Sequence, residues 1–341
     1  MSMTKKPLTI LHNNLSQDED YNRDINDIHT VLAMAGYEVS RLPVDGNVEK
    51  LISDIKLLSP MCIFNLCEEV KEDSWGEIYI AGLLELLGIP YTGTGPYGLA
   101  LCLDKAKNKD ILSNNGIKVP AYQVCTFGQQ GSELKLSFPV IMKPLHEDGS
   151  YGIVSDAVVT DKRGLEEKTK MIYEQYGQPA IAEEYIKGRE FNVSILGNGD
   201  KRKALPLAEL DFSNMPLDLP RICSYRAKWT PDSAEFKGTI PICPVKMRTS
   251  LQHKMESIAL DVCRIINCCD YARVDMRMKD DETIYVIDVN PNPCISPDAG
   301  FVKAAQTAGM DYGTLINEIV NICLERKSGV LINDAEIITT G

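Results

Sequence analysis

The most informative part of this sequence is YARVDMRM at residues 271–278, followed after KDDE by TIYVIDVNPNP at residues 283–293. Both segments carry strand-forming residues, and the polar KDDE between them is typical of a turn. The two segments are therefore predicted to form an antiparallel hairpin.

One face of this hairpin should carry polar side chains. Because successive side chains of a strand point to opposite faces, Arg273 and Asp275 share one face, as do Asp288 and Asn290. Two carboxylates and an amide oxygen can then converge, and such oxygen ligands on rigid strands suit Mg²⁺. A solvated polar face on an edge hairpin is the alternative interpretation.

A second group of functional candidates precedes the hairpin in the chain. Lys143 lies near the end of the strand-like run FPVIMKP, and the glycine-bearing loop EDGSYG follows at residues 147–152. Such a loop can present backbone N–H groups to phosphate oxygens, while the lysine adds a positive charge. The loop taken alone fits an ordinary β-hairpin equally well.

The first part of the chain alternates strand-like and helix-like patterns. Strands are expected near residues 8–14, 37–44 and 61–66, with helices near 24–35 and 48–58. This βαβαβ order predicts a parallel sheet.

The later part of the chain has a different pattern. Strands near 138–144, 153–160 and 179–186, with a helix near 165–176, suit a small α+β lobe. Four further segments follow: a strand near 190–197, a polar loop at 221–238, a helix near 251–263 and a final helix near 312–325.

The bulk composition narrows the classes of function. With 341 residues and 44% hydrophobic content, the chain suits two or three packed lobes. A net charge of -12 argues against nucleic acid or an anionic membrane as partner, so small molecules are expected. No stretch has the length and apolarity of a membrane span, and the 11 scattered cysteines indicate reduced thiols, so a cytoplasmic location is expected.

The glycines at 93, 95 and 98 fit the pattern G-x-G-x-x-G. A dinucleotide fingerprint follows the first strand of a βαβ unit and needs an acidic residue about 20 positions later. Lys118 stands at that distance, so the pattern lacks its acidic partner.

Several ordered motifs between residues 83 and 296 together resemble the ATP-grasp superfamily, and within it the D-alanine–D-alanine ligase group. The motifs are LLELLGIPYTGTGPYGLALCLDKAKNKDILSNNGIKVP, FPVIMKPLHEDGSYGI, EEYIKGREFNVSILG, YRAKW, and ARVDMRM with IDVNPNP. The resemblance implies a three-lobed α/β fold with ATP between the second and third lobes. The lobes would be a parallel α/β lobe at 1–104, a small α+β lobe at 105–186 and an α+β lobe with an antiparallel sheet at 187–325, before a tail at 326–341.

The resemblance also implies which residues bind ATP. Phosphate contacts would come from Lys105, Lys143 and Lys228, adenine contacts from Glu183, Ile186 and the backbone of Glu184, and a ribose contact from Glu190. Lys228 would lie in a mobile lid at residues 221–238.

For the chemistry, the resemblance implies that Asp275, Asp288 and Asn290 hold two Mg²⁺ ions, with Mn²⁺ as an alternative metal. Arg273 would neutralise an acyl phosphate and the tetrahedral intermediate that follows it. Ser150 would take part in hydrogen bonds on the substrate side.

Three positions depart from the family pattern near these residues. Asp288 stands where a glutamate is usual, Cys294 where a glycine N–H helps to bind the oxyanion, and Gly149 where a serine is usual, with Ser150 next to it. The first lobe departs further, because HNNLSQDED at 12–20 and FNLCEEVKEDSWGE at 64–77 replace the glycine-rich segments of the family.

The expected function is ADP-forming ligation of a carboxylate to an amine through an acyl phosphate, with amino acids or short peptides as substrates. True D-alanine–D-alanine ligation, an ATP-grasp phosphotransferase and a non-catalytic nucleotide-binding protein are the alternatives. A homodimer is a possible assembly. The carboxylates that could receive the amine of the first substrate are Asp18, Glu19, Asp20, Glu68, Glu69 and Glu77.

Overall fold

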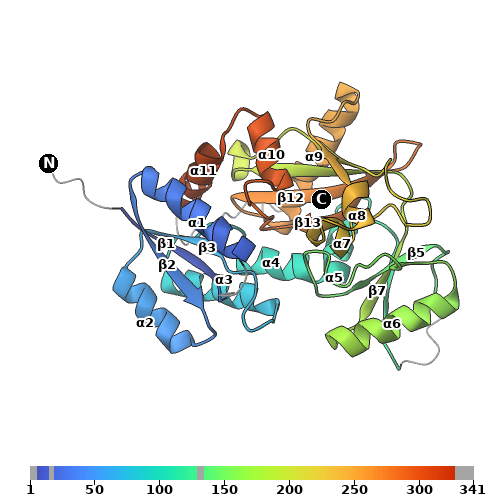
Figure 1. Ribbon diagram of the computed structural model, residues 1–341, viewed down its shortest axis with the longest axis horizontal. Helices are drawn as coiled ribbons and strands as arrows, with labels where there is room; N and C mark the ends of the chain where they lie inside the picture. The colour runs from blue at the N-terminus through green and yellow to red at the C-terminus, as the bar shows by residue number, and fades with distance from the viewer. Residues whose placement is uncertain (1–5, 15–18, 129–133, 327–341) are drawn as a thin grey trace, which may run out of the picture. The chain divides into compact units, whose positions relative to one another are not determined.

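A computed structural model of the chain describes residues 6–14, 19–128 and 134–326 (Figure 1). The described residues divide into two compact units. One contains the residues up to Pro96 together with those from Gly313 onward, and the other contains Tyr97–Tyr312. Asp18 and most of the expected tail at 326–341 lie outside the described residues.

The first unit is built on a parallel sheet with strand order β2-β1-β3. Its strands are β1 (Lys6–Asn13), β2 (Tyr37–Val44) and β3 (Cys62–Leu66), and its helices are α1 (Glu19–Met34), α2 (Val48–Leu58), α3 (Trp75–Leu87) and most of α11 (Tyr312–Glu325). The predicted βαβαβ order and parallel sheet are confirmed. Local signals set the helix ends: the Asn47 side chain accepts a hydrogen bond from the N–H of Lys50 at the start of α2.

The second unit contains a small antiparallel sheet of order β4-β7-β5-β6. It consists of β4 (Tyr122–Cys125), β5 (Val140–Pro144), β6 (Val158–Val159) and β7 (Ala180–Glu184), with α6 (Lys162–Tyr176) beside it and α4 (Pro96–Leu103) and α5 (Lys105–Asn114) before it (Figure 1).

The strand predicted near 153–160 is wrong for most of its length, because only Val158–Val159 pair as a strand. The preceding backbone makes turns instead, in which Ile153 N–H donates to Ser150 O and Ala157 N–H donates to Val154 O. The apolar residues of this segment therefore lie in turns that follow the glycine loop.

The second unit also contains a larger antiparallel sheet of order β11-β10-β8-β12-β13, with β9 paired to β8. Its strands are β8 (Arg189–Leu196), β9 (Lys203–Ala204), β10 (Ala208–Asp211), β11 (Ile240–Ile242), β12 (Tyr271–Met278) and β13 (Ile284–Asn290). The helices in this part of the second unit are α7 (Tyr225–Trp229), α8 (Ala234–Gly238), α9 (Thr249–Ile266) and α10 (Gly300–Thr307). The predicted hairpin is confirmed as β12 and β13, which pair antiparallel with a bulge after Asp275.

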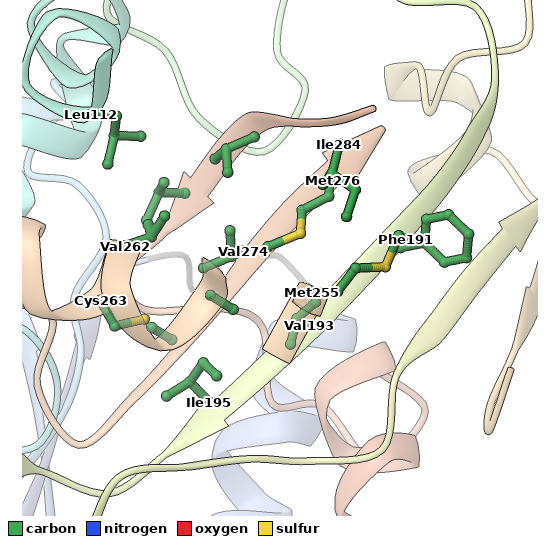
Figure 2. Close-up of a cluster of buried hydrophobic side chains, with 14 of the residues drawn as sticks. Leu112, Phe191, Val193, Ile195, Met255, Val262, Cys263, Val274, Met276 and Ile284 are labelled. Atoms are coloured by element: carbon green, nitrogen blue, oxygen red, sulfur yellow. The ribbon is translucent and has the colours of Figure 1, made fainter. Parts of the chain in front are cut away.

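One face of this larger sheet forms the core against α9. Figure 2 shows Phe191, Val193 and Ile195 of β8 clustered with Val274 of β12 and Met255 of α9. Each of these side chains is buried. Because strand side chains alternate, the residues between them point to the opposite face, where the polar residues of the hairpin lie.

Candidate active site

Asp275 accepts several hydrogen bonds on the polar face of the hairpin. Arg273 Nε and Nη2 donate to its Oδ1 and Oδ2 at 2.7 and 2.8 Å. Asn192 Nδ2 also donates to Oδ1 at 2.7 Å, and Asn290 Nδ2 donates to Oδ2 at 3.1 Å. Each oxygen thus accepts two hydrogen bonds, which uses the capacity of a carboxylate.

Asp288 lies directly opposite Asp275 in the strand pairing, and Asn290 lies opposite Arg273. Burial raises the pKa of a carboxyl group, but positive charges around Asp288 outweigh burial and hold its pKa below the ordinary value. The lysines that supply these charges are Lys105, Lys143, Lys109 and Lys228. The structure therefore brings the three lysines expected at phosphate close to the expected metal ligands.

Lys109 is a candidate that the sequence prediction missed. It is buried on α5, and its Nζ lies 3.2 Å from Glu183 Oε1 and donates to Ile287 O at 3.1 Å. Lys143 Nζ contacts the other oxygen of Glu183, at 3.0 Å. Lys109 follows Lys105 by one helical turn, and this i, i+4 spacing on one helix face was the available signal.

Burial and the charge of Lys143 lower the pKa of Lys109, although Glu183 acts in the opposite direction. For Lys143, burial is outweighed by Glu183 and Asp288, and the pKa is raised. Two buried ammonium groups thus share one carboxylate, and an added anion would relieve their repulsion.

The glycine loop at 147–152 contacts the predicted lid. Ser150 Oγ donates to Cys223 O at 3.2 Å, and Trp229 Nε1 donates to Gly149 O at 3.1 Å. Lys105 Nζ donates to Glu147 O at the start of the loop. Gly152 must be glycine, because its φ is +74° and a Cβ would meet Pro144 Cγ at 2.4 Å.

The lid itself contains two short helices, which the sequence prediction described only as a polar loop. Ser224 and Ser233 cap α7 and α8 through side-chain hydrogen bonds. Between the helices, Glu235 accepts a hydrogen bond from Ser155 and pairs with Arg226 Nε at 3.3 Å. This contact joins the lid to the segment after the glycine loop.

The residues expected at adenine and ribose line the hinge between the two sheets of the second unit. Glu183 is occupied by the two lysines, and the N–H of Glu184 donates to Ala121 O at 2.8 Å. The Glu184 side chain pairs with Lys279 at 2.9 Å. Ile186 is buried, and Glu190 pairs with Arg277, which sequence reasoning also missed.

The departing segments of the first unit contact one another. Asn13 Oδ1 accepts hydrogen bonds from the N–H groups of Glu68 at 2.9 Å and Glu69 at 3.3 Å. Tyr21 Oη donates to Leu66 O at 3.0 Å and accepts from Asn13 N–H at 2.9 Å. Hydrogen bonds thus connect Asn13 and Tyr21 to the chain at Leu66, Glu68 and Glu69.

Comparison with known proteins identifies the family of the chain. The family model described as D-ala D-ala ligase C-terminus matches residues 111–321. The chain belongs to the D-alanine–D-alanine ligase family. The uncharacterized protein y4sG of Sinorhizobium fredii is 33% identical over 267 residues, which cover 78% of this chain and 76% of that protein.

Two further relatives span more of the chain. D-alanine–D-alanine ligase of Desulforudis audaxviator is 28% identical over 299 residues, covering 86% of this chain and 90% of that protein. The crystal structure of D-alanine–D-alanine ligase from Bacillus anthracis complexed with ATP has a TM-score of 0.75 at 24% identity, covering 94% of this chain and 98% of that one. The predicted ATP-grasp fold of the D-alanine–D-alanine ligase family is therefore confirmed.

The part matched by the family model contains the hairpin, the glycine loop and the lid, and it begins after Lys105 and Lys109. All 11 cysteines lie in the described residues, and none is in a disulfide. Among the helices that the structure describes, none is both long and apolar enough to cross a membrane.

Proposed function

We propose that this protein is an ATP-dependent, ADP-forming ligase that joins a carboxylate to an amine through an acyl phosphate. The observation that carries the proposal is a cluster of lysines beside the hairpin. Lys109 and Lys143 are buried and share Glu183 at 3.2 and 3.0 Å, and their charges act on Asp288 together with those of Lys105 and Lys228. Buried ammonium groups need compensating negative charge, and the triphosphate of a bound ATP would supply it.

The nucleotide would bind along the hinge of the second unit. Lys105, Lys143 and Lys228 would contact its phosphates together with Lys109. Glu183, the backbone of Glu184 and Ile186 would hold adenine, and Glu190 would bind the ribose. Phosphoryl transfer depends mainly on positioning and on neutralising charge, which suits a site made of lysines on rigid elements.

The residues on the hairpin fit Mg²⁺, or Mn²⁺ in its place. Asp275, Asp288 and Asn290 offer hard oxygen ligands, and the lowered pKa of Asp288 keeps its carboxylate ionised. These residues would hold one or two ions, which would neutralise phosphate oxygens when bound. Asp275 can become a ligand only when at least one of its donors, Arg273, Asn192 or Asn290, turns away, because its oxygens already accept four hydrogen bonds.

Arg273 is the residue we assign to the acyl phosphate. Its guanidinium pairs with Asp275 through two parallel hydrogen bonds, the geometry that also suits a phosphate group. A substrate carboxylate would attack the γ-phosphate, and an amine would then displace phosphate from the acyl group. Arg273 would neutralise the charge that develops at this centre, and Ser150 would help to hold the glycine loop against the lid.

Amino acids or short peptides are the proposed substrates, and true D-alanine–D-alanine ligation is the second candidate, supported by the named relatives. A phosphotransferase would release ADP without an amine, and a non-catalytic protein would bind ATP without turnover. We place the protein in the cytoplasm, with a homodimer as a possible assembly.

A phosphate-release screen tests the proposed function. Amino acids of both chiralities and dipeptides are supplied singly and in pairs with ATP and Mg²⁺, and products are identified by mass. Phosphate release that depends on an amine, with a product heavier by one acyl unit, is the expected result. Nucleotide binding without release over the whole panel would contradict ligase activity.

A further inference from the structure

Arg277 is a buried cation at the hinge of the second unit. The residue is 4% exposed, and Glu190, opposite it in the pairing of β12 with β8, is 5% exposed. Arg277 Nε and Nη2 donate to Glu190 Oε2 at 2.9 and 2.6 Å. A pair removed from water in this way is sustained only by good geometry and further hydrogen bonds.

Glu190 uses only one of its two oxygens for this pair. Among the described residues, none makes a hydrogen bond to Oε1. Oε1 is also not among the solvent-inaccessible side-chain atoms that lack a hydrogen-bond partner, so it is accessible. An ionised carboxylate is a pure acceptor, so an accessible Oε1 suits a ligand that brings hydroxyl donors.

The remaining donors of Arg277 hold the backbone around this carboxylate. Nη1 donates to Ile186 O at 2.8 Å, and Nη2 also donates to Arg221 O, at the first residue of the lid segment. Tyr185 Oη donates to the same Arg221 carbonyl at 3.3 Å, and its ring lies 5.3 Å from the Arg277 guanidinium. Only a planar fork of several donors can make these contacts together, because lysine offers a single ammonium group.

We propose that Arg277 is a positioning residue that fixes Glu190 so that Oε1 faces the ribose hydroxyls of the nucleotide. The inference rests on the ATP-dependent function proposed above. Through its hydrogen bonds to Ile186 O and Arg221 O, the same side chain also fixes the hinge and the start of the lid relative to Glu190. Arg277 itself contacts no reacting atom.

Isothermal titration calorimetry of the full chain with ATP, 2′-deoxy-ATP and 3′-deoxy-ATP, in the presence of Mg²⁺, tests the proposal without knowledge of the other substrates. The wild-type protein should bind ATP at least about tenfold more tightly than one of the deoxy nucleotides, as expected for a hydrogen bond to a charged group. Arg277→Lys keeps the charge and loses the fork, so this ratio should fall toward one.

Arg189→Lys is the matched control. Arg189 precedes Glu190 on β8 and makes a similar two-bond pair with Glu209, at 2.6 and 2.7 Å, but on a half-exposed side chain. This variant should keep the wild-type ratio. Thermal unfolding shows whether each variant is folded, and Glu190→Gln, which should also lose the ribose preference, replaces Arg277→Lys if the latter does not fold.

An equal loss of affinity for all three nucleotides in the folded Arg277→Lys variant would show a merely structural role and overturn the proposal. So would a wild-type protein that binds ATP without any ribose preference, although ATP-dependent function would survive that result. A wild-type protein that binds no nucleotide would overturn the proposed function, and this inference with it.

Discussion

The nucleotide side of the second unit and the loops of the first unit differ in how closely they follow the family pattern. In the second unit, the lysines that the family motifs single out lie near Asp288, which is paired with Asp275 across the hairpin. In the first unit, Asn13 and Tyr21 share hydrogen bonds with Glu68 and Leu66, in the region predicted to depart from the family's glycine-rich pattern. The family model, which begins at residue 111, does not include the first unit's sheet.

This difference reflects what each region has to do. Binding a triphosphate requires cations and oxygen ligands in a fixed geometry, whatever carboxylate or amine reacts. Recognition of the substrates depends on their shape and charge and can vary on the same fold. We therefore expect residues of the second unit to determine the rate of ATP turnover, and residues of the first unit to determine which substrates react.

The largest effect is expected at the hairpin. Asp275→Asn keeps the size of the side chain but removes the charge needed for metal binding, so phosphate release should fall on the order of 10³-fold while the fold persists. Asp281→Asn, in the exposed turn of the same hairpin, is the control and should retain activity. Near-normal release by Asp275→Asn at low magnesium would refute the ligand assignment.

The first unit is tested by substrate preference. D-alanine is not expected to be the preferred amino-terminal substrate, because Glu68, Glu69 and Glu77 offer carboxylates from backbone positions other than that of the family's glutamate. An ammonium group in a closed site needs a matched carboxylate. Steady-state kinetics should therefore give D-alanine a catalytic efficiency at least about tenfold below that of the best substrate. If the catalytic efficiency with D-alanine alone exceeds that with every other amino acid and dipeptide, this prediction is wrong, and the first unit follows the family's substrate preference as well.

A third prediction concerns the contact of Lys109 with the phosphates of ATP. Lys109→Met should raise the KM for ATP about ten- to hundredfold, as expected for one charge-assisted contact. Lys107→Met is the matched control, because that side chain lies on the same helix and is 66% exposed. Equal KM values for the two variants would remove Lys109 from the phosphate site.

The pH dependence of ATP binding gives a second measure of Lys109. Burial and Lys143 lower its pKa, so Lys109 loses its proton at a lower pH than a solvated lysine does. As pH rises, the affinity for ATP should therefore begin to decrease at a pH lower than the ordinary lysine pKa. This early decrease should be absent in Lys109→Met. Superimposable pH profiles would contradict the assignment.

The smallest effect is expected at the lid. Glu235→Gln weakens the contacts with Ser155 and Arg226, so limited proteolysis within residues 221–238 should accelerate about threefold without nucleotide. ATP with magnesium should protect the wild-type segment. Glu282→Gln, which alters an exposed pair with Arg248, is the control. Cleavage that is equal with and without ATP would show that the lid does not close on nucleotide.

Regular patterns made much of this molecule predictable from its sequence. The alternation in ARVDMRM and IDVNPNP predicted both the hairpin and its polar face, because side chains of a strand repeat with a period of two. Arg277 continues the alternation of Arg273 and Asp275, so it could have been placed on that face as well. Its partner Glu190 comes from a strand distant in sequence, and no local pattern indicates that pairing.

Other features depend on contacts that are not encoded locally. The apolar residues near Val154 read as a strand, but Ile153 O accepts a hydrogen bond from Tyr225 N–H in the lid, far along the chain. Lys109 reads as a solvated helix residue until Glu183 is brought next to it. The division of the chain at 104 and 186 stays a prediction.

The return of the final helix to the first unit has a consequence for biosynthesis. Buried residues of α11, among them Leu315, Ile319 and Cys323, belong to the same unit as β3, and Cys323 Sγ lies 3.5 Å from Cys62 Sγ. The ribosome makes all of the second unit between these two parts. The first unit can therefore complete its core only after the second unit has left the exit tunnel, although its own strands are made first.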